Sequence, residues 1–573
     1  MAYTLTLAGL KCLMLEAGRE YNATTEPAMF QRPDQAPLGG ASTPDKPAGF
    51  WDATVDGGWQ VPGEPYTNAS EDPKEQFFWW RARMLGGRTN HWGRVSLRNG
   101  PYDFKPRSRD GLGFDWPINY DDLEPYYTKV ELLIGVHGTN EGMENTPDSP
   151  AGVLQRPPKP RVHELMLHKF GKTLGFPMIP IHRAVLTQTQ DANSIPARLH
   201  PGNSWAQKIV AESMRGRAAC FWATPCGRGC SIRANYQSTT VHLPPALATG
   251  NLDIISNAHA REVLINKAGK ADGVLFIDKT TGREERVRGR AVVLAASSGE
   301  TVRILLNSKT TRPEGLANSS GLVGKYIMDS VDTSLGAQIP AMENLPPHNE
   351  DGASGDHMYA PWWLYKEQLA GKLDFPRGYH TEPGGATRQM PSGGNPVTES
   401  FLGDAYGTKL KEEARRYYGS VIHVGCRGEM IPNENCYAEL DSTVRDKWDI
   451  PVLRWHWKWS EYELKMVLHA QRTYADIFSA MGGKLLRPLR NDPKDLIAQG
   501  GRVIHEVGGA IMGADRKRSV CNGWNQTWDI PNLIVCDGAA FASNSDKNPT
   551  LTIMALAWRA ADHLIEESRK GKL

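Results

Sequence analysis

Residues 11–18 read Lys-Cys-Leu-Met-Leu-Glu-Ala-Gly, a short apolar run that ends in an acidic residue and a glycine. This pattern is typical of the second strand of a Rossmann βαβ unit, in which the carboxylate accepts hydrogen bonds from a ribose of a dinucleotide. The sequence therefore predicts a strand over residues 11–18, preceded by a helix over Met1–Leu7, and makes Glu16 a candidate ribose ligand. The predicted fold class is α/β.

The Gly-x-Gly-x-x-Gly phosphate loop stands roughly 20 residues before that acidic residue in a Rossmann unit. Residues 1–15 hold one glycine, Gly9, and no such loop. We therefore expect the first strand and phosphate loop to be missing, either because the start codon was assigned too late or because the protein is a remnant. The N-terminal residues carry no signal-peptide pattern and favour a cytoplasmic protein, while a periplasmic location through a partner subunit or a missing N-terminus stays open.

Length and charge narrow the class of protein. The chain has 573 residues, with 66 Lys+Arg against 64 Asp+Glu and a net charge of +2. At roughly 100–200 residues per domain, two to four domains are expected. The charge balance excludes a dedicated nucleic-acid binder, and 40% apolar residues exclude a wholly disordered chain. No apolar run reaches the roughly 18 residues of a transmembrane helix. A large α/β enzyme is the class that remains.

Hydrophobic periodicity predicts the main elements beyond residue 18. Residues 19–75 are rich in Pro, Gly, Asp and Thr and are expected to be irregular. Four short antiparallel strands are expected at 252–255, 262–266, 273–278 and 283–288, and further strands at 290–296 and 533–537. Helices are expected at 120–136, 164–174, 300–307, 462–481 and 550–568.

Five motifs occur in one order along nearly the whole chain, and together they resemble the glucose–methanol–choline (GMC) oxidoreductases, which are FAD enzymes that oxidise alcohols and sugars. The Gly-Gly…His-Trp, His-Glu-Val-Gly-Gly and Asn-Pro-Thr forms look closest to the sugar-oxidising branch, which includes pyranose 2-oxidase, glucoside 3-dehydrogenases, and fructose and gluconate dehydrogenases. The motifs are Leu15–Gly18, Gly86–Trp92, Val292–Asn307, His505–Gly509, and Asp537-Gly538 with Asn548-Pro549-Thr550.

The resemblance implies a discontinuous, Rossmann-like FAD-binding domain and a second domain for the substrate. The second domain would be built on a mostly antiparallel sheet backed by helices. The expected FAD-binding segments are residues 1–105, 215–330 and 500–573, and the expected substrate-binding and cover segments are residues 106–214 and 331–499.

The same resemblance implies oxidation of a secondary alcohol of a sugar or glycoside to a ketone. A neutral imidazole is a suitable base for the hydroxyl proton near neutral pH, and an amide can both donate to and accept from the substrate hydroxyl. We expect His505 to be that base and Asn548 to position the hydroxyl, while flavin N5 accepts the hydride. Two other hypotheses stay open: a flavin-free remnant or sugar-binding protein, and a choline- or alcohol-type oxidase.

The family pattern also assigns residues to FAD. In pyranose oxidase-like members, the histidine of a Thr-His-Trp sequence carries the flavin covalently; here the residue before His91 is Asn90, so covalent and noncovalent contact both stay open. The expected FAD contacts are Glu16, Arg19, Gly87, Asn90, His91, Trp92, Val263, Ala296, Asp537, Gly538, Pro549 and Thr550.

Three cysteines lie close together in the sequence, at Cys220, Cys226 and Cys230. Thiolates on a glycine-containing loop could hold an iron–sulfur cluster, as in some sugar dehydrogenases of the family, although the spacing is not a standard four-cysteine pattern. A disulfide is a second alternative, and simple free thiols are the favoured one. The expected partners are a sugar or glycoside, a small subunit, and a cytochrome or quinone that accepts electrons.

Overall fold

Two pairs of short parallel strands form one side of the molecule. The computed structural model describes residues 1–26, 57–90, 92–221, 230–345, 356–386 and 403–572. Strand β1 (Cys12–Leu15) pairs with β6 (Leu252–Ile255), and β10 (Val292–Leu294) pairs with β18 (Leu533–Val535), both in parallel register. The strands predicted at 11–18, 290–296 and 533–537 are confirmed, although each is shorter than expected.

The prediction that residues 252–255 pair in an antiparallel sheet is wrong. Leu252 lies opposite Cys12 in parallel register. The antiparallel sheet begins only after the turn that follows β6, and it contains the other three predicted strands, β7 (Ala258–Ile265), β8 (Ala271–Asp278) and β9 (Glu284–Arg288). The apolar residues of β6 are therefore used beside β1, a partner far away in the sequence that local pattern does not reveal.

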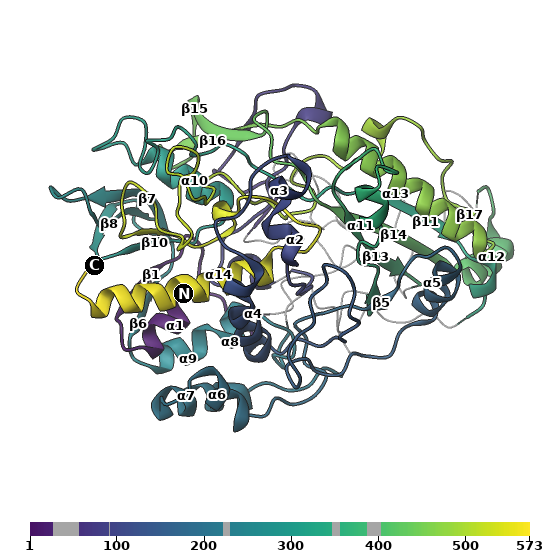
Figure 1. Ribbon diagram of the computed structural model, residues 1–573, viewed down its shortest axis with the longest axis horizontal. Coiled ribbons are helices and arrows are strands. Elements are labelled where there is room, and N and C mark those ends of the chain that lie inside the picture. The colour runs from purple at the N-terminus through teal and green to yellow at the C-terminus, as the bar shows by residue number, and fades with distance from the viewer. Residues whose placement is uncertain (27–56, 91, 222–229, 346–355, 387–402, 573) are drawn as a thin grey trace.

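Helices at the two ends of the chain pack together on this side. Helix α1 (Ala2–Leu7) contacts both α14 (Thr550–Arg569) and α9 (Leu243–Ala248), and the two termini lie near each other at the left of Figure 1. Helix α14 also packs along α4 (Tyr120–Ile134). These contacts confirm the helices predicted at 1–7, 120–136 and 550–568. They also place the start of α14 in the interior, because Leu551 and Thr552 are fully buried.

A four-stranded antiparallel sheet forms the other side, at the right of Figure 1. Its order is β13 (Tyr379–Gly385), β14 (Val421–Gly428), β11 (Ser334–Gln338) and β17 (Lys484–Leu485). Helix α13 (Glu461–Ala480) covers one face and contacts β11, β14 and β17. The predicted arrangement, a mostly antiparallel sheet backed by helices, is confirmed.

Smaller elements connect and cover the two sides. Helix α10 (Ser298–Asn307) confirms the helix predicted at 300–307, and α5 (Val162–Thr173) the one at 164–174. The remaining strands are β15 (Tyr437–Arg445), β16 (Pro451–His456), β3 (Thr67–Asn68), β12 (Met358–Tyr359), β5 (Ile179–Pro180), β2 (Gly57–Gly58) and β4 (Arg81–Ala82). The remaining α-helices are α2 (Pro101–Phe104), α3 (Pro106–Asp110), α6 (Ser194–Leu199), α7 (Ser204–Arg215), α8 (Ser238–Val241), α11 (Tyr365–Leu369) and α12 (Gly407–Tyr417), with short 3-10 turns that include η5 (Gly87–Asn90) and η10 (Gly538–Ala540).

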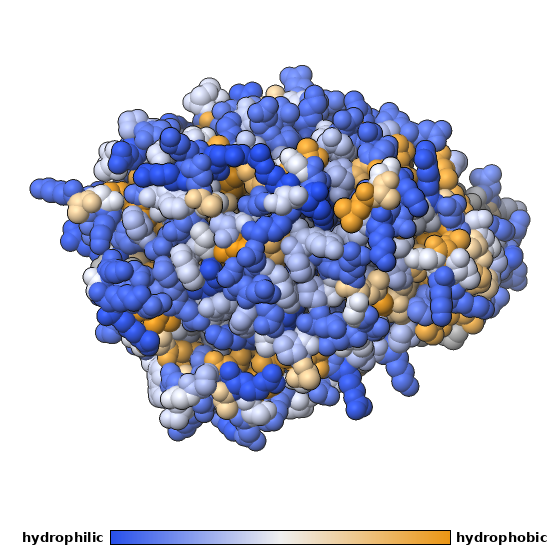
Figure 2. Space-filling model, in the orientation of Figure 1, coloured by the Kyte–Doolittle hydropathy of each residue, from blue (hydrophilic) through white to orange (hydrophobic). Residues whose placement is uncertain are grey.

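The visible surface is mainly hydrophilic, with apolar residues scattered in small groups (Figure 2). Within the described segments, every helix is too short or too polar to cross a bilayer.

A buried arginine joins the segment before α2 to helix α4. Arg98 donates to both carboxylate oxygens of Glu131, at 2.8 and 2.6 Å, and both side chains are almost completely buried. The adjacent Asn99 accepts a hydrogen bond from Ser545, which lies just before the predicted substrate-positioning residue Asn548. The ion pair therefore helps to fix a segment that supports the candidate site.

Replacing Arg98 by Met should reduce the free energy of unfolding by about 3–5 kcal/mol, because Glu131 would then be a buried charge without its partner. The matched control is Arg416→Met, which removes a far more exposed arginine that pairs with Glu343 and should lower the free energy of unfolding much less, because water screens an exposed pair. Chemical denaturation of both variants would measure the difference, and equal losses would contradict this assignment.

Candidate functional site

The predicted base, His505, is held by hydrogen bonds on its backbone and its ring. Its backbone N–H donates to Asp329 Oδ1 at 2.9 Å, and its Nδ1 lies 2.9 Å from the Ser330 hydroxyl. Its Nε2 lies 3.3 Å from Nδ2 of Asn548. The two residues that the sequence predicts to act together on a substrate are thus in direct contact.

These contacts select one tautomer of His505. An amide Nδ2 can only donate, so the Nε2 of His505 accepts from Asn548 and carries a lone pair. The ring proton is then on Nδ1, where it is donated to the Ser330 oxygen. Burial and the nearby Arg427 guanidinium lower the pKa of His505 to about 3. The imidazole is therefore neutral at ordinary pH, with its basic nitrogen on the side of Asn548.

Asn548 is 8% exposed, and its Oδ1 is buried without a hydrogen-bond partner among the described residues. It stands directly before α14, whose first turn has no side-chain cap. Buried helix N-termini are normally satisfied by a cap or a ligand, and they favour negative charge. The amide oxygen without a partner and the uncapped helix end at Pro549 and Thr550 are two sets of polar groups that a bound group could satisfy.

Lys547 fixes the loop that carries Asn548. Its Nζ lies 3.1 Å from Asp103 and 2.5 Å from Asp546, and all three side chains are buried. Although burial lowers it, the two carboxylates raise the pKa of Lys547 well above its usual value. Oxygens of Asp103, Asp546 and Glu429 lie within 4.8 Å of one another. Because Lys547, Arg109 and Arg377 pair with these three carboxylates, this group is an ion-pair network rather than a cation site.

Four of the five motifs, all except Leu15–Gly18, are joined to one another by short contacts. Arg88 pairs with Glu506 at 2.6 Å, which joins the Gly86–Trp92 motif to the His505–Gly509 motif. Gly508 donates its backbone N–H to the carbonyl of Gly538 at 2.8 Å, so the latter motif also lies beside Asp537-Gly538.

Helix α10 completes this arrangement. Ser298 donates to the carbonyl of Gly508 at 2.6 Å, and Thr301 donates to Asp537 Oδ2 at 2.6 Å. Burial raises the pKa of Asp537 to about 6. Before the helix, Ala296 is exposed at the carboxyl end of β10, and Ser297 has a φ of 79°. An exposed alanine and a left-handed serine at the start of a buried helix are a suitable place for a bound group.

Glu16 occupies its predicted place at the carboxyl end of β1. Its Oε1 accepts from the backbone N–H of Gly18 at 2.7 Å, and burial raises its pKa. Gly87 has a φ of 51°, and a Cβ atom added there would meet nothing within 4 Å. An acidic residue after β1, open glycine backbone and the uncapped start of α14 fit the predicted FAD, whose ribose and ring carbonyls need these partners.

Other predicted FAD contacts have protein partners instead. Both side-chain ends of Asn90 are occupied, by the carbonyl of Leu85 and the hydroxyl of Thr239. Asn90 therefore holds the Gly86-Gly87 turn in place. The backbone N–H of Val263 donates to the Ser308 hydroxyl at 2.9 Å, so this N–H is not available to an adenine.

Arg19 pairs with Glu26 at 2.9 Å, and Trp92 Nε1 donates to the carbonyl of Tyr236 at 3.4 Å. His91 lies outside the described residues, so the alternatives of covalent and noncovalent FAD contact stay predictions.

One of the three cysteines that the sequence singles out, Cys226, lies outside the described residues. Cys220 and Cys230 belong to no cluster of described residues with metal-binding geometry.

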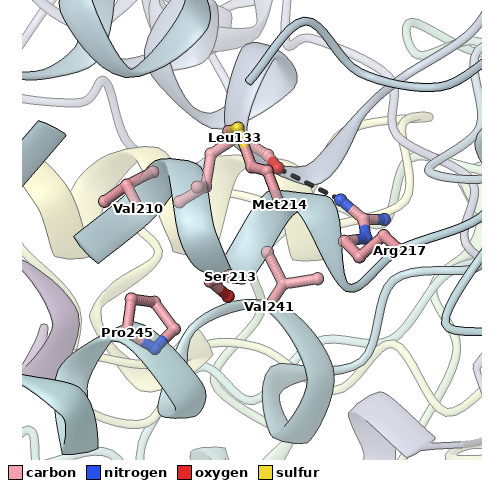
Figure 3. A pocket seen from close by; sticks show the side chains of 7 residues that line it. All are labelled: Leu133, Val210, Ser213, Met214, Arg217, Val241 and Pro245. Atoms are coloured by element: carbon pink, nitrogen blue, oxygen red, sulfur yellow. Dashed lines mark hydrogen bonds between the residues drawn. The ribbon is translucent and has the colours of Figure 1, made fainter. Parts of the chain in front are cut away.

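A small cavity between helices α4, α7, α8 and α9 is not the substrate site (Figure 3). It is lined by Leu133, Val210, Ser213, Met214, Arg217, Val241 and Pro245, and its volume of about 10 Å³ holds no more than one water molecule. Figure 3 also shows Arg217, which donates to the Leu133 carbonyl at the end of α4.

Sequence reasoning missed Ser330, Asp329, Lys547 and the Arg88–Glu506 pair. Lys547 precedes the Asn-Pro-Thr motif, and Arg88 and Glu506 lie within two other motifs. Their positions in the sequence could therefore have marked them as candidates. Ser330 and Asp329 gave none, because they lie about 175 residues from His505 in the sequence.

Asp329 should make stability depend on pH. Burial and the nearby Glu506 raise its pKa to about 7, above the usual value near 3.8. Because the pKa of Asp329 is higher in the folded protein than in the unfolded chain, its protonated carboxyl group contributes to the free energy of unfolding. That contribution is complete below about pH 4 and is lost as the pH rises to 7. The difference in free energy of unfolding between Asp329→Asn and wild type should therefore shift in favour of the variant by about 2 kcal/mol from about pH 5 to about pH 8. Urea denaturation at the two pH values measures this, and a constant difference would exclude the assignment.

The chain matches two models of the GMC oxidoreductase family, over residues 38–331 and 432–557. It is 31% identical over 500 residues to the 2-methyl-1,2-propanediol dehydrogenase of Mycolicibacterium austroafricanum, in a match covering 84% of this chain and 80% of that protein. It is 27% identical to the fructose dehydrogenase large subunit of Gluconobacter japonicus, over 100% of this chain and 96% of that one. Pyridoxine 4-oxidase from Mesorbium loti has a similar fold, with a TM-score of 0.60 at 14% identity over 98% and 97% of the two chains.

Proposed function

Because this chain belongs to the GMC oxidoreductase family, as its motifs predicted, we propose that it oxidises a secondary alcohol of a sugar or glycoside to a ketone with His505 as the base. Members of the family bind FAD, and the chain is an FAD-dependent enzyme that acts on CH–OH groups. The observation that carries the proposal is the contact between the lone pair of His505 Nε2 and the Asn548 amide.

The bound FAD supplies a hydride acceptor for the carbon that carries the hydroxyl. Glu16 would hold a ribose, and Asp537 with Gly538 would lie near the ribityl and pyrophosphate. The uncapped start of α14, at Pro549 and Thr550, would face the ring that gains negative charge.

The protein's own part in the reaction is the movement of a proton. The substrate hydroxyl replaces the direct contact between His505 Nε2 and the Asn548 amide: it donates to Nε2, accepts from the amide, and its proton moves to Nε2. The carbon–hydrogen bond breaks in the same oxidation, its electron pair leaves as hydride, and a carbon–oxygen double bond forms. A base with a pKa of about 3 cannot ionise an alcohol in advance, so we expect the proton to leave as the carbonyl forms.

A sugar or glycoside is the substrate class that we favour. Fructose dehydrogenase large subunit matches this chain over its whole length, which supports a sugar. The propanediol dehydrogenase relative supports a smaller hydroxyl compound instead. Both relatives are named for compounds with more than one hydroxyl group, so a choline-type substrate is the less favoured alternative.

The finer predictions on cofactors and partners are part of the same proposal. Noncovalent FAD is favoured, covalent attachment through His91 is the alternative, and an iron–sulfur cluster at Cys220, Cys226 and Cys230 is not favoured. The word "subunit" in the fructose dehydrogenase name supports a partner chain that passes electrons to a cytochrome or quinone.

The purified protein should show flavin absorption bands. After acid precipitation the yellow colour should pass into the supernatant, whereas colour that stays in the pellet would identify covalent attachment. A colourless protein that also takes up no added FAD would contradict the FAD assignment.

His505→Ala should slow reduction of the bound flavin by substrate by about 10²–10⁴-fold, because positioned proton transfer contributes that much. Ser330→Ala should also slow flavin reduction, but by a smaller factor. Without the Ser330 hydroxyl, His505 can also adopt its other tautomer. The control is His456→Ala, which removes a histidine paired with Glu439 away from these contacts. Anaerobic stopped-flow reduction would measure all three, and a wild-type rate for His505→Ala would reject His505 as the base.

A further inference from the structure

The sheet of β13, β14 and β11 has one apolar and one polar face. On β14, Ile422, Val424 and Cys426 are buried on the side of α13. Gly425 and Arg427 alternate with them and therefore lie on the opposite face. Glu382 of β13 is directly across from Gly425, so it shares this face. Helix α13 covers the apolar face of the sheet and does not cover the polar face.

Three charged side chains are joined on the polar face. Arg427 lies 2.7 Å from Asp332 and 3.4 Å from Glu382. The side chains of Asp332, Arg427 and Glu382 are 27%, 25% and 13% exposed. They are therefore accessible to a small molecule, whereas a purely structural buried ion pair such as Arg98–Glu131 is not. We call these three residues the ion triad.

The ion triad is linked at both ends to the catalytic pair. Asp332 follows Ser330, which holds the ring of His505. At the other end, Glu382 accepts from His380 Nε2 at 3.2 Å, and His380 Nδ1 contacts the carbonyl of Asp546, just before Asn548. The chain of contacts thus closes into a ring. Arg427 and Glu382 are also close enough to influence the pKa of His505.

The surface between these groups is kept low by glycine. A Cβ atom added at Gly425 would have Asp332 Oδ1 as its nearest neighbour, at 3.6 Å, and one added at Gly384 would have His423 at 3.5 Å. Both distances are ordinary van der Waals contacts, so the two glycines keep the strands free of side chains beside the ion triad.

Carboxylates accept hydrogen bonds from hydroxyl groups, and a guanidinium donates several in a fixed fork. Two carboxylates on either side of one guanidinium therefore offer alternating acceptors and donors, a pattern that matches adjacent hydroxyl groups. They also give the triad a net charge of −1, which disfavours an anionic ligand. An uncharged compound with several neighbouring hydroxyl groups meets both conditions.

We propose that Asp332, Arg427 and Glu382 bind the non-reacting hydroxyl groups of the substrate and select uncharged polyhydroxy compounds over simple alcohols and over sugar acids. This inference rests on the proposed function, because it places the reacting hydroxyl at His505 and Asn548. The binding energy of the remote hydroxyls would orient the reacting carbon beside the base.

The test compares kcat/KM for four probes: fructose, methyl glucoside, isopropanol and gluconate. In wild type, fructose or methyl glucoside should exceed both isopropanol and gluconate. Glu382→Gln should lower kcat/KM for the preferred sugar by about 10- to 100-fold, mainly through KM, because a charged hydrogen bond is lost. The ratio of sugar to isopropanol should fall. The ratio of gluconate to sugar should rise, because one negative charge is gone.

The matched control is Glu343→Gln, which removes a carboxylate of the same kind that pairs with Arg416 near helix α12. It should leave all four ratios unchanged. Asp332→Asn tests the other end of the triad and should shift the ratios in the same direction if Glu382→Gln does not fold. Flavin content and circular dichroism establish that each variant is folded.

Equal losses for every probe would show that the triad only supports the sheet, and unchanged ratios would show that the substrate does not touch it; either result overturns the inference. These outcomes differ from failure of the proposed function, in which wild type would oxidise no alcohol at all. An enzyme that oxidises isopropanol as well as it oxidises sugars would retain His505 as base and lose only the ion triad as a selector.

Discussion

The buried ammonium of Lys547 and its two carboxylates hold together the parts of the chain that make the site. Asp103 belongs to α2, Asp546 to the loop before α14, and Asn548 follows Lys547 directly. A buried ion pair gains little over an apolar core in stability, but removing one partner leaves an uncompensated charge. The network therefore constrains where this loop can lie, and the position of Asn548 relative to His505 depends on that constraint.

Burial also sets the protonation states around the base. The same low-dielectric surroundings that lower the pKa of His505 to about 3 raise those of Asp329 to about 7 and Asp537 to about 6. Each group is thereby pushed towards its neutral form, because burial disfavours charge. The result is a neutral imidazole next to the reacting hydroxyl, with nearby charges held in pairs such as Arg88–Glu506 and Lys547–Asp546. The ion triad adds partly exposed charges that can act on the remote hydroxyl groups.

Part of the fold follows from local pattern. The apolar run before Glu16 predicted β1, and the spacing of apolar residues predicted α4, α13 and α14. The pairing of β6 was predicted wrongly, because its partner β1 lies about 240 residues away and an apolar strand carries no record of its neighbour. Strand identity is local, whereas strand pairing is decided by the packing of the whole chain.

The sequence by itself determined the five motifs, the family to which they belong, and the pair His505 and Asn548, since each is a short pattern of residue types. Only the tertiary structure decided which tautomer His505 adopts, because the Asn548 amide and the Ser330 hydroxyl reach its ring from other segments. It also decided that Asp332, Arg427 and Glu382 stand together, since the register of an antiparallel sheet sets which side chains share a face. Contacts between residues far apart in sequence depend on the folded backbone, and a linear pattern cannot encode their geometry.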